Sequence, residues 1–143
     1  MSNQPIIIER TFHAPIAKVW QAITDNDEMK KWYFNLADFK PEVGFTFQFK
    51  GGPDEGPQYV HLCEVTQVVP GKKIAYTWRY EGLPGSSEVI WELFEKGEDT
   101  LLKLTHSGVD SFSENGKDFA ANSFNEGWTH FVHIALKKYF EEK

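Results

Sequence analysis

The sequence predicts an α+β fold of the helix-grip kind. In this fold a curved antiparallel six-stranded sheet wraps around a long C-terminal helix, and two short helices follow the first strand. Helical periodicity is confined to residues 12–33 and 119–140. The sequence between them alternates apolar and polar residues and is divided by short turn signals, which indicates an antiparallel meander. We expect a single domain over residues 1–143, with a cavity between sheet and helix.

The N-terminal part predicts one strand and two short helices. Residues 5–12 begin with β-branched side chains, and Pro15 suits the first turn of a helix. One apolar stripe then repeats at helical spacing through Ile16, Val19, Trp20 and Ile23. Asp25 can cap a second helix, which we expect to continue through Trp32 and Tyr33.

The middle of the chain predicts the remaining strands. Phenylalanines at positions 45, 47 and 49 alternate with polar residues, so one face of that strand is apolar. Four further strands are predicted at residues 58–69, 73–80, 87–95 and 100–106, separated by Gly- and Pro-containing turns. We expect the apolar faces of these strands to pack against the last helix. Glu64 and Arg79 are expected to form an ion pair across this sheet.

The C-terminal helix is predicted to run from Phe119 to Phe140 with one apolar side. That side carries Phe124, Trp128, Phe131, Val132, Ala135, Leu136 and Tyr139. Gly127 costs a helix about 1 kcal/mol relative to alanine. Its presence therefore predicts a close approach to the sheet or to a ligand.

Composition excludes several function classes. The formal net charge is −6 and no basic run is present, which argues against a nucleic-acid partner. No segment approaches the roughly 20 apolar residues that span a bilayer, so no membrane insertion is expected. The single cysteine, Cys63, cannot form an intramolecular disulfide, which suits a reducing, cytoplasmic location. No motif for a metal or another cofactor is present, and we expect none.

The aromatic content of 15% points to a ligand pocket. Each aromatic residue alone is best explained as core, but bulky rings on a concave sheet together favour a lined cavity. The predicted ligand-binding residues are Phe45, Phe47, Phe49, His61, Tyr76, Trp78, Trp91, His106, Phe124, Trp128 and Phe131. No catalytic residue is assigned. In the enzyme alternative, His61, Tyr76 or His106 would act as a general acid or base.

Several motifs resemble the START-like, or birch-pollen-allergen-like (SRPBCC), superfamily. They are FHAPIAKVWQAIT followed by MKKW, VTQVVPGKKIAYTW, TLLKLTHSGV and NEGWTHFVHIALKKYF. Their order and spacing resemble the bacterial branch named after the activator of the heat-shock-protein-90 ATPase, specifically its C-terminal domain. The resemblance covers nearly the whole chain. It implies a cavity between the sheet and the long helix, but superfamily members differ widely in activity.

We therefore expect a protein that binds a small hydrophobic ligand, whether aromatic, polyketide-like or lipid-like. One alternative is a polyketide cyclase or hydrolase. The other is a chaperone-associated protein-interaction module, although the chain shows no second domain and stimulation of the chaperone is not expected. The expected state is a monomer or weak dimer. If side chains fill the cavity, the loops at residues 51–57 and 82–87 would carry the function.

Overall fold

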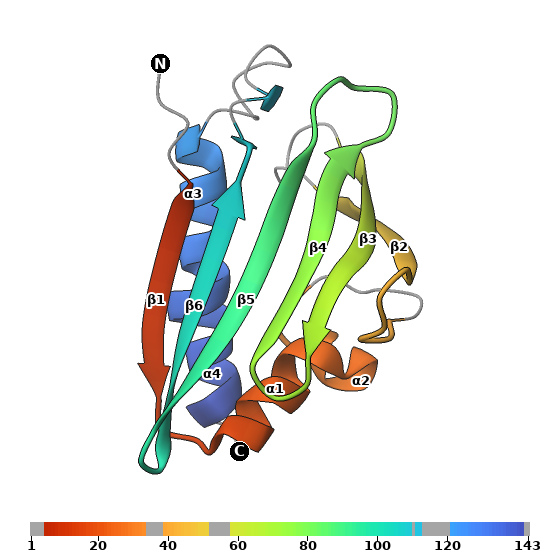
Figure 1. The fold of residues 1–143 in the computed structure, drawn as a ribbon. Helices are drawn as coiled ribbons and strands as arrows, with labels where there is room; N and C mark the ends of the chain where they lie inside the picture. Colours follow the sequence, from red (N-terminus) through yellow and green to blue (C-terminus); the bar gives the residue numbers. More distant parts are fainter. Residues whose placement is uncertain (1–4, 34–38, 52–57, 110, 113–120, 142–143) are drawn as a thin grey trace.

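The computed structural model describes residues 5–33, 39–51, 58–109, 111–112 and 121–141 (Figure 1). The elements in chain order are β1 (Ile6–Phe12), α1 (Ile16–Thr24), α2 (Asn26–Met29), β2 (Thr46–Gly51), β3 (Tyr59–Val69), β4 (Lys73–Tyr80), β5 (Ser87–Lys96), β6 (Asp99–Ser107), α3 (Ala121–Thr129), the π-helical segment η3 (His130–Ala135) and α4 (Leu136–Glu141). The residues predicted for the loop after Gly51 and for the start of the last helix at Phe119 lie outside the described part.

The strands form one antiparallel six-stranded sheet in the order β1-β6-β5-β4-β3-β2. β2 to β6 are a meander, and β1 joins its far end by pairing Ile6 with His106 and Phe12 with Thr100. The C-terminal helix lies against one face of the curved sheet, and α1 and α2 lie at one end of it (Figure 1). The predicted fold class is confirmed.

Strict alternation along the strands builds the core. On β6, for example, Leu102, Leu104 and His106 are completely buried while the residues between them are half-exposed. Alternate residues point to opposite faces of a sheet, so one face of each strand packs toward the helix and the other meets solvent. Among the described residues no helix is long and apolar enough to cross a membrane.

The two N-terminal helices form as predicted, with one correction. Asp25 caps α2, because its Oδ1 accepts hydrogen bonds from the backbone N–H groups of Asp27 (2.9 Å) and Glu28 (3.3 Å). However, α2 ends at Met29 and does not continue through Trp32 and Tyr33. The indole N–H of Trp32 donates to the carbonyl oxygen of Ala22 in α1 at 2.8 Å. Tertiary contacts thus hold the chain after Met29 in a turn.

The C-terminal helix is not a uniform α-helix. Over His130–Ala135 it is π-helical, and the backbone N–H of Leu136 donates to the carbonyl oxygen of Phe131, five residues earlier. Trp128, Val132 and Leu136 are all buried. Four residues advance an α-helix by about 40° beyond a full turn. The wider π turn reduces this drift and keeps all these side chains facing the sheet.

The prediction that Gly127 approaches the sheet closely is wrong. Gly127 is exposed, and a Cβ atom built on it would meet no described atom within 4 Å. By contrast, a Cβ atom on Gly85, whose φ is +107°, would lie 2.6 Å from Phe112 Cδ1.

We expect Gly127→Ala to raise the free energy of unfolding by about 0.5–1 kcal/mol, because alanine loses less backbone entropy in a helix. Urea denaturation followed by circular dichroism measures this change. The contrasting variant is Gly85→Ala, which should destabilise by about 1–3 kcal/mol through overpacking and a left-handed backbone. A destabilised Gly127→Ala variant would mean that the glycine is required.

Candidate functional site

The predicted ligand-binding residues gather on the concave face of the sheet and the facing side of the helix. Phe45 and Phe131 are half-buried, and the other nine are buried. Their rings form a continuous cluster, in which Phe47 lies 5.2 Å from Tyr76 and Trp78 lies 5.3 Å from Trp128 between ring centroids. Phe45 lies at the margin of this cluster, just before β2 begins.

Tyr33 is a central member of the cluster that the sequence did not single out as a site residue. Its ring stacks on Trp128 (6.3 Å) and meets Phe131 edge to face (5.0 Å). Its hydroxyl lies 3.1 Å from the hydroxyl of Tyr76, which also accepts a hydrogen bond from the Trp91 indole at 2.9 Å. Tyr33 therefore connects the turn after α2 to both the sheet and the helix.

A buried hydrogen-bond chain joins the helix to three strands. The indole N–H of Trp128 can only donate, so His106 Nδ1 accepts from it at 2.9 Å. In the neutral imidazole the proton then lies on Nε2, which donates to Ser87 Oγ at 2.7 Å. The Ser87 hydroxyl donates in turn to the carbonyl oxygen of Trp78 at 2.8 Å. Every side-chain polar atom of Trp128, His106 and Ser87 therefore has a hydrogen-bond partner.

This arrangement opposes an acid–base role for His106. Both ring nitrogens are occupied, and burial lowers the pKa of His106 to about 3. Protonation would turn Nδ1 into a donor that faces the Trp128 N–H, which is also a donor. The geometry gives His106 a structural role, in which it positions Trp128 against the sheet.

The other candidate polar groups are also uncharged near neutral pH. Burial lowers the pKa of His61 to about 4, partly offset by hydrogen bonds to backbone carbonyls, including that of Tyr59 (3.0 Å). The His61 ring stacks on Phe49 at 4.5 Å. Burial raises the pKa of Tyr76, and its hydrogen bonds with Tyr33 and Trp91 only partly oppose this. The cluster is therefore an apolar surface with neutral hydrogen-bonding groups.

A cleft of about 840 Å³ opens beside the aromatic cluster. One wall is the turn Lys31, Trp32 and Tyr33 after α2. The other wall comes from η3 and α4 and consists of His130, Phe131, Ile134, Ala135, Lys138 and Tyr139. Its volume falls within the range of small-molecule sites, roughly 300–1,000 Å³. Of the eleven predicted ligand-binding residues, only Phe131 lines this cleft. Its ring and that of Tyr33, which also lines the cleft, pack on the buried cluster through contacts with Trp128.

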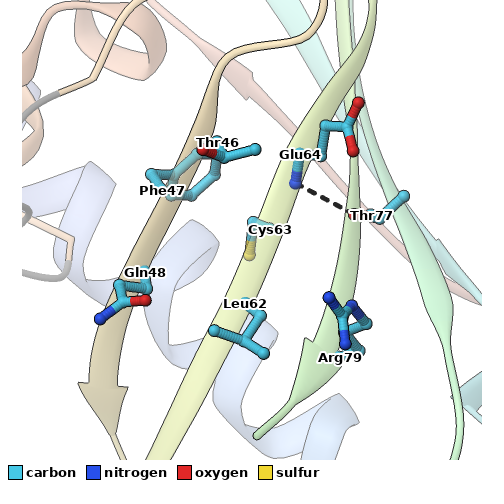
Figure 2. Close-up of a pocket in the computed structure, with 8 residues that line it drawn as sticks. All are labelled: Thr46, Phe47, Gln48, Leu62, Cys63, Glu64, Thr77 and Arg79. Carbon is cyan, nitrogen blue, oxygen red and sulfur yellow. Dashed lines mark hydrogen bonds between the residues drawn. The ribbon is translucent and has the colours of Figure 1, made fainter.

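A smaller hollow of about 220 Å³ lies on the sheet face opposite the helix (Figure 2). The pairing of β3 with β4 is interrupted here, and the Glu64 backbone N–H donates to Thr77 Oγ1 at 3.0 Å. The expected ion pair is wrong, since Glu64 and Arg79 form no salt bridge in the described part of the chain. Exposed polar side chains and a small volume make this hollow a poor ligand site.

The structure adds two residues that sequence reasoning missed. Ser87 is buried on β5 in line with Val89 and Trp91, and a small polar residue in such an apolar series is a usable signal. Tyr33 gave no such signal, because helical periodicity assigned it to α2. Its position depends on the turn after Met29, which only tertiary packing reveals.

The chain matches the family described as activator of Hsp90 ATPase homolog 1-like protein over residues 13–141. No curated protein sequence matches it. Among solved structures, CalU16 from Micromonospora echinospora is 26% identical (TM-score 0.75, covering 95% of this chain and 75% of CalU16). MLL2253 from Mesorhizobium loti is also 26% identical (TM-score 0.76, covering 98% of both chains).

DynU16, a protein in the dynemicin biosynthetic locus, is 23% identical with a TM-score of 0.78. The match covers 98% of this chain but only 48% of DynU16, so this chain spans about half of that protein. The chain belongs to the activator of Hsp90 ATPase homolog 1-like family, within the START-like superfamily. This fold and the described site fit a ligand-binding domain.

The buried histidines predict a loss of stability in mild acid. The pKa values of His106 and His61, about 3 and about 4, lie below the value of about 6.5 expected in the unfolded chain. The unfolded state therefore binds more protons as the pH falls below 6.5, and the free energy of unfolding decreases toward pH 4. Each histidine contributes up to about 1.4 kcal/mol per pH unit in this window.

Urea denaturation between pH 7 and pH 4.5 checks this dependence. We expect His106→Gln to be less stable at pH 7 but to lose less stability with acidification. The slope of its free energy of unfolding against pH should be smaller by the contribution of one proton, up to about 1.4 kcal/mol per pH unit. His130→Gln, at an exposed helix position, is the matched control. Equal slopes for the unaltered protein and His106→Gln would contradict the neutral, buried state of His106.

Proposed function

We propose that this protein binds a small, largely apolar ligand, aromatic, polyketide-like or lipid-like, in the cleft between the turn after α2 and the C-terminal helix. The cleft beside η3 is the binding site, and Tyr33 and Phe131, which also pack in the aromatic cluster, supply its aromatic surface. The observation that carries this proposal is that Tyr33 and Phe131 line the cleft and also pack in the aromatic cluster.

The ring contacts of Phe131 support ligand binding in the cleft beside η3. Phe131 is only half-buried, and its ring lies 5.0 Å from Tyr33 and 5.9 Å from Trp128. A ligand in the cleft would therefore touch a ring that already packs on the core. Flat aromatic or aliphatic groups would gain roughly 25 cal/mol for each Å² of apolar surface that they remove from water.

The same geometry favours binding over acid–base catalysis. A general base needs a pKa near the working pH and an unoccupied lone pair within reach of the substrate. His106 has neither, and the pKa values of His61 and Tyr76 are displaced away from neutrality. We therefore favour a carrier or sensor of the ligand over the cyclase or hydrolase alternative. We further propose a cytoplasmic location, since the single cysteine is buried and unpaired.

Phe131→Ala tests the proposal directly. We expect at least a tenfold loss of affinity for apolar ligands, since truncation removes the ring shared by cleft and cluster. Tryptophan fluorescence quenching with flavonoid-like, polyketide and fatty-acid ligands measures affinity, and native mass spectrometry detects co-purified ligand.

The matched control is Phe94→Ala, which removes an exposed ring at 41% exposure outside the cleft and should leave affinity unchanged. The proposal is wrong if no ligand class quenches the unaltered protein, or if both variants bind as well as it does.

A further inference from the structure

The cleft beside η3 differs in charge from the chain as a whole. The protein carries a net charge of −6, yet the described residues lining this cleft include Lys31, His130 and Lys138 and no acidic residue. Its inner part is aromatic, since Tyr33 and Phe131 lie there. An apolar floor thus meets a basic rim.

Lys138 is the lysine best placed to receive an anion. The Lys31 ammonium lies 3.3 Å from Oε2 of Glu28. The other carboxylate oxygen of Glu28, Oε1, accepts a hydrogen bond from the Tyr139 hydroxyl. The charge of Lys31 is therefore largely compensated. Lys138 is exposed, and no described carboxylate lies within salt-bridge distance of it. An anionic group entering the cleft would meet Lys138 as an uncompensated charge.

The helical wall of the cleft has an unusual backbone. Phe131 and Ile134 both belong to the π-helical segment, a conformation that is rare and frequently found at functional sites. Ile134 is 57% exposed, although it is a large aliphatic residue. A ligand with an apolar body would cover it and remove that surface from water.

A second surface cleft, of about 580 Å³, provides a contrast. It lies beside α1 and α2, and its lining includes Asp25 and Asp27 and no basic residue among the described ones. Like charges repel, so an anion is disfavoured there. Charge thus distinguishes the two clefts.

Resting on the proposed function, we propose that the cleft beside η3 selects apolar ligands that carry an anionic group, such as a carboxylate. The apolar body packs on Tyr33, Phe131 and Ile134, and the anion pairs with Lys138. The preferred ligands are therefore apolar acids, such as fatty acids or aromatic acids, rather than neutral sterols or hydrocarbons. This selection follows from one uncompensated cation, Lys138, at a cleft whose inner part is aromatic.

Two fluorescent probes that share one ring framework test the selection. 1-Anilinonaphthalene-8-sulfonate carries a permanent negative charge, and N-phenyl-1-naphthylamine is its neutral counterpart. In Lys138→Glu we expect the affinity of the sulfonate to fall about 5–10-fold. The variant loses the attraction of a partly exposed ion pair and adds repulsion between the sulfonate and the new carboxylate. The affinity of the neutral probe should change less than about twofold, and Lys138→Met should weaken the sulfonate about threefold.

Lys137→Glu is the matched control, because it changes the net charge equally at the next helix position. Lys137 lies 3.8 Å from Glu141 and does not line the cleft. It should leave both affinities within about twofold.

The outcomes separate the two proposals. If neither probe binds, the proposed function and this inference both fail. If both probes bind but Lys138→Glu affects them alike or not at all, the inference alone fails. It also fails if Lys137→Glu weakens the sulfonate as much as Lys138→Glu does, because the effect would then reflect overall charge. Selective weakening of the sulfonate by Lys138→Glu supports the inference.

Discussion

The hydrogen-bond chain from Trp128 through His106 and Ser87 to the Trp78 carbonyl is the interaction on which the rest of the structure depends. It links α3 to β6, β5 and β4 at the centre of the molecule. A buried polar group without a partner costs about 1–3 kcal/mol, so only one relative placement of helix and sheet satisfies the whole chain. Apolar packing alone would tolerate sliding of the helix along the sheet. Directional bonds remove that freedom.

This constraint also explains why the site suits binding. His106 and Tyr76 are the polar groups of the aromatic cluster that help to hold the fold together. Both are neutral and already hydrogen-bonded. Such groups stabilise a rigid apolar surface and have little capacity left for proton transfer. Uncompensated positive charge lies instead at the rim of the cleft, on Lys138. The molecule therefore has a neutral, hydrogen-bonded interior and a basic rim at the cleft.

Periodicity predicted most of the fold because it records which side of each element is buried. The strand boundaries of β4 and the cap at Asp25 agree with the structure, since both follow from local rules. The extent of α2 and the packing role of Gly127 were wrong. Both depend on contacts between distant segments, such as the bond from Trp32 to Ala22, that no local pattern contains.

By itself the sequence determined the α+β class, the strand faces and most of the aromatic residues that meet between sheet and helix. These follow from burial, which a pattern of apolar spacing encodes directly. Only the tertiary structure decided what those residues can do. The tautomer of His106, the place of Tyr33 in the cluster and the π-helical wall of the cleft all arise from geometry between elements. Chemical role depends on distances of a few ångströms across the fold, and the order of residues along the chain does not specify them.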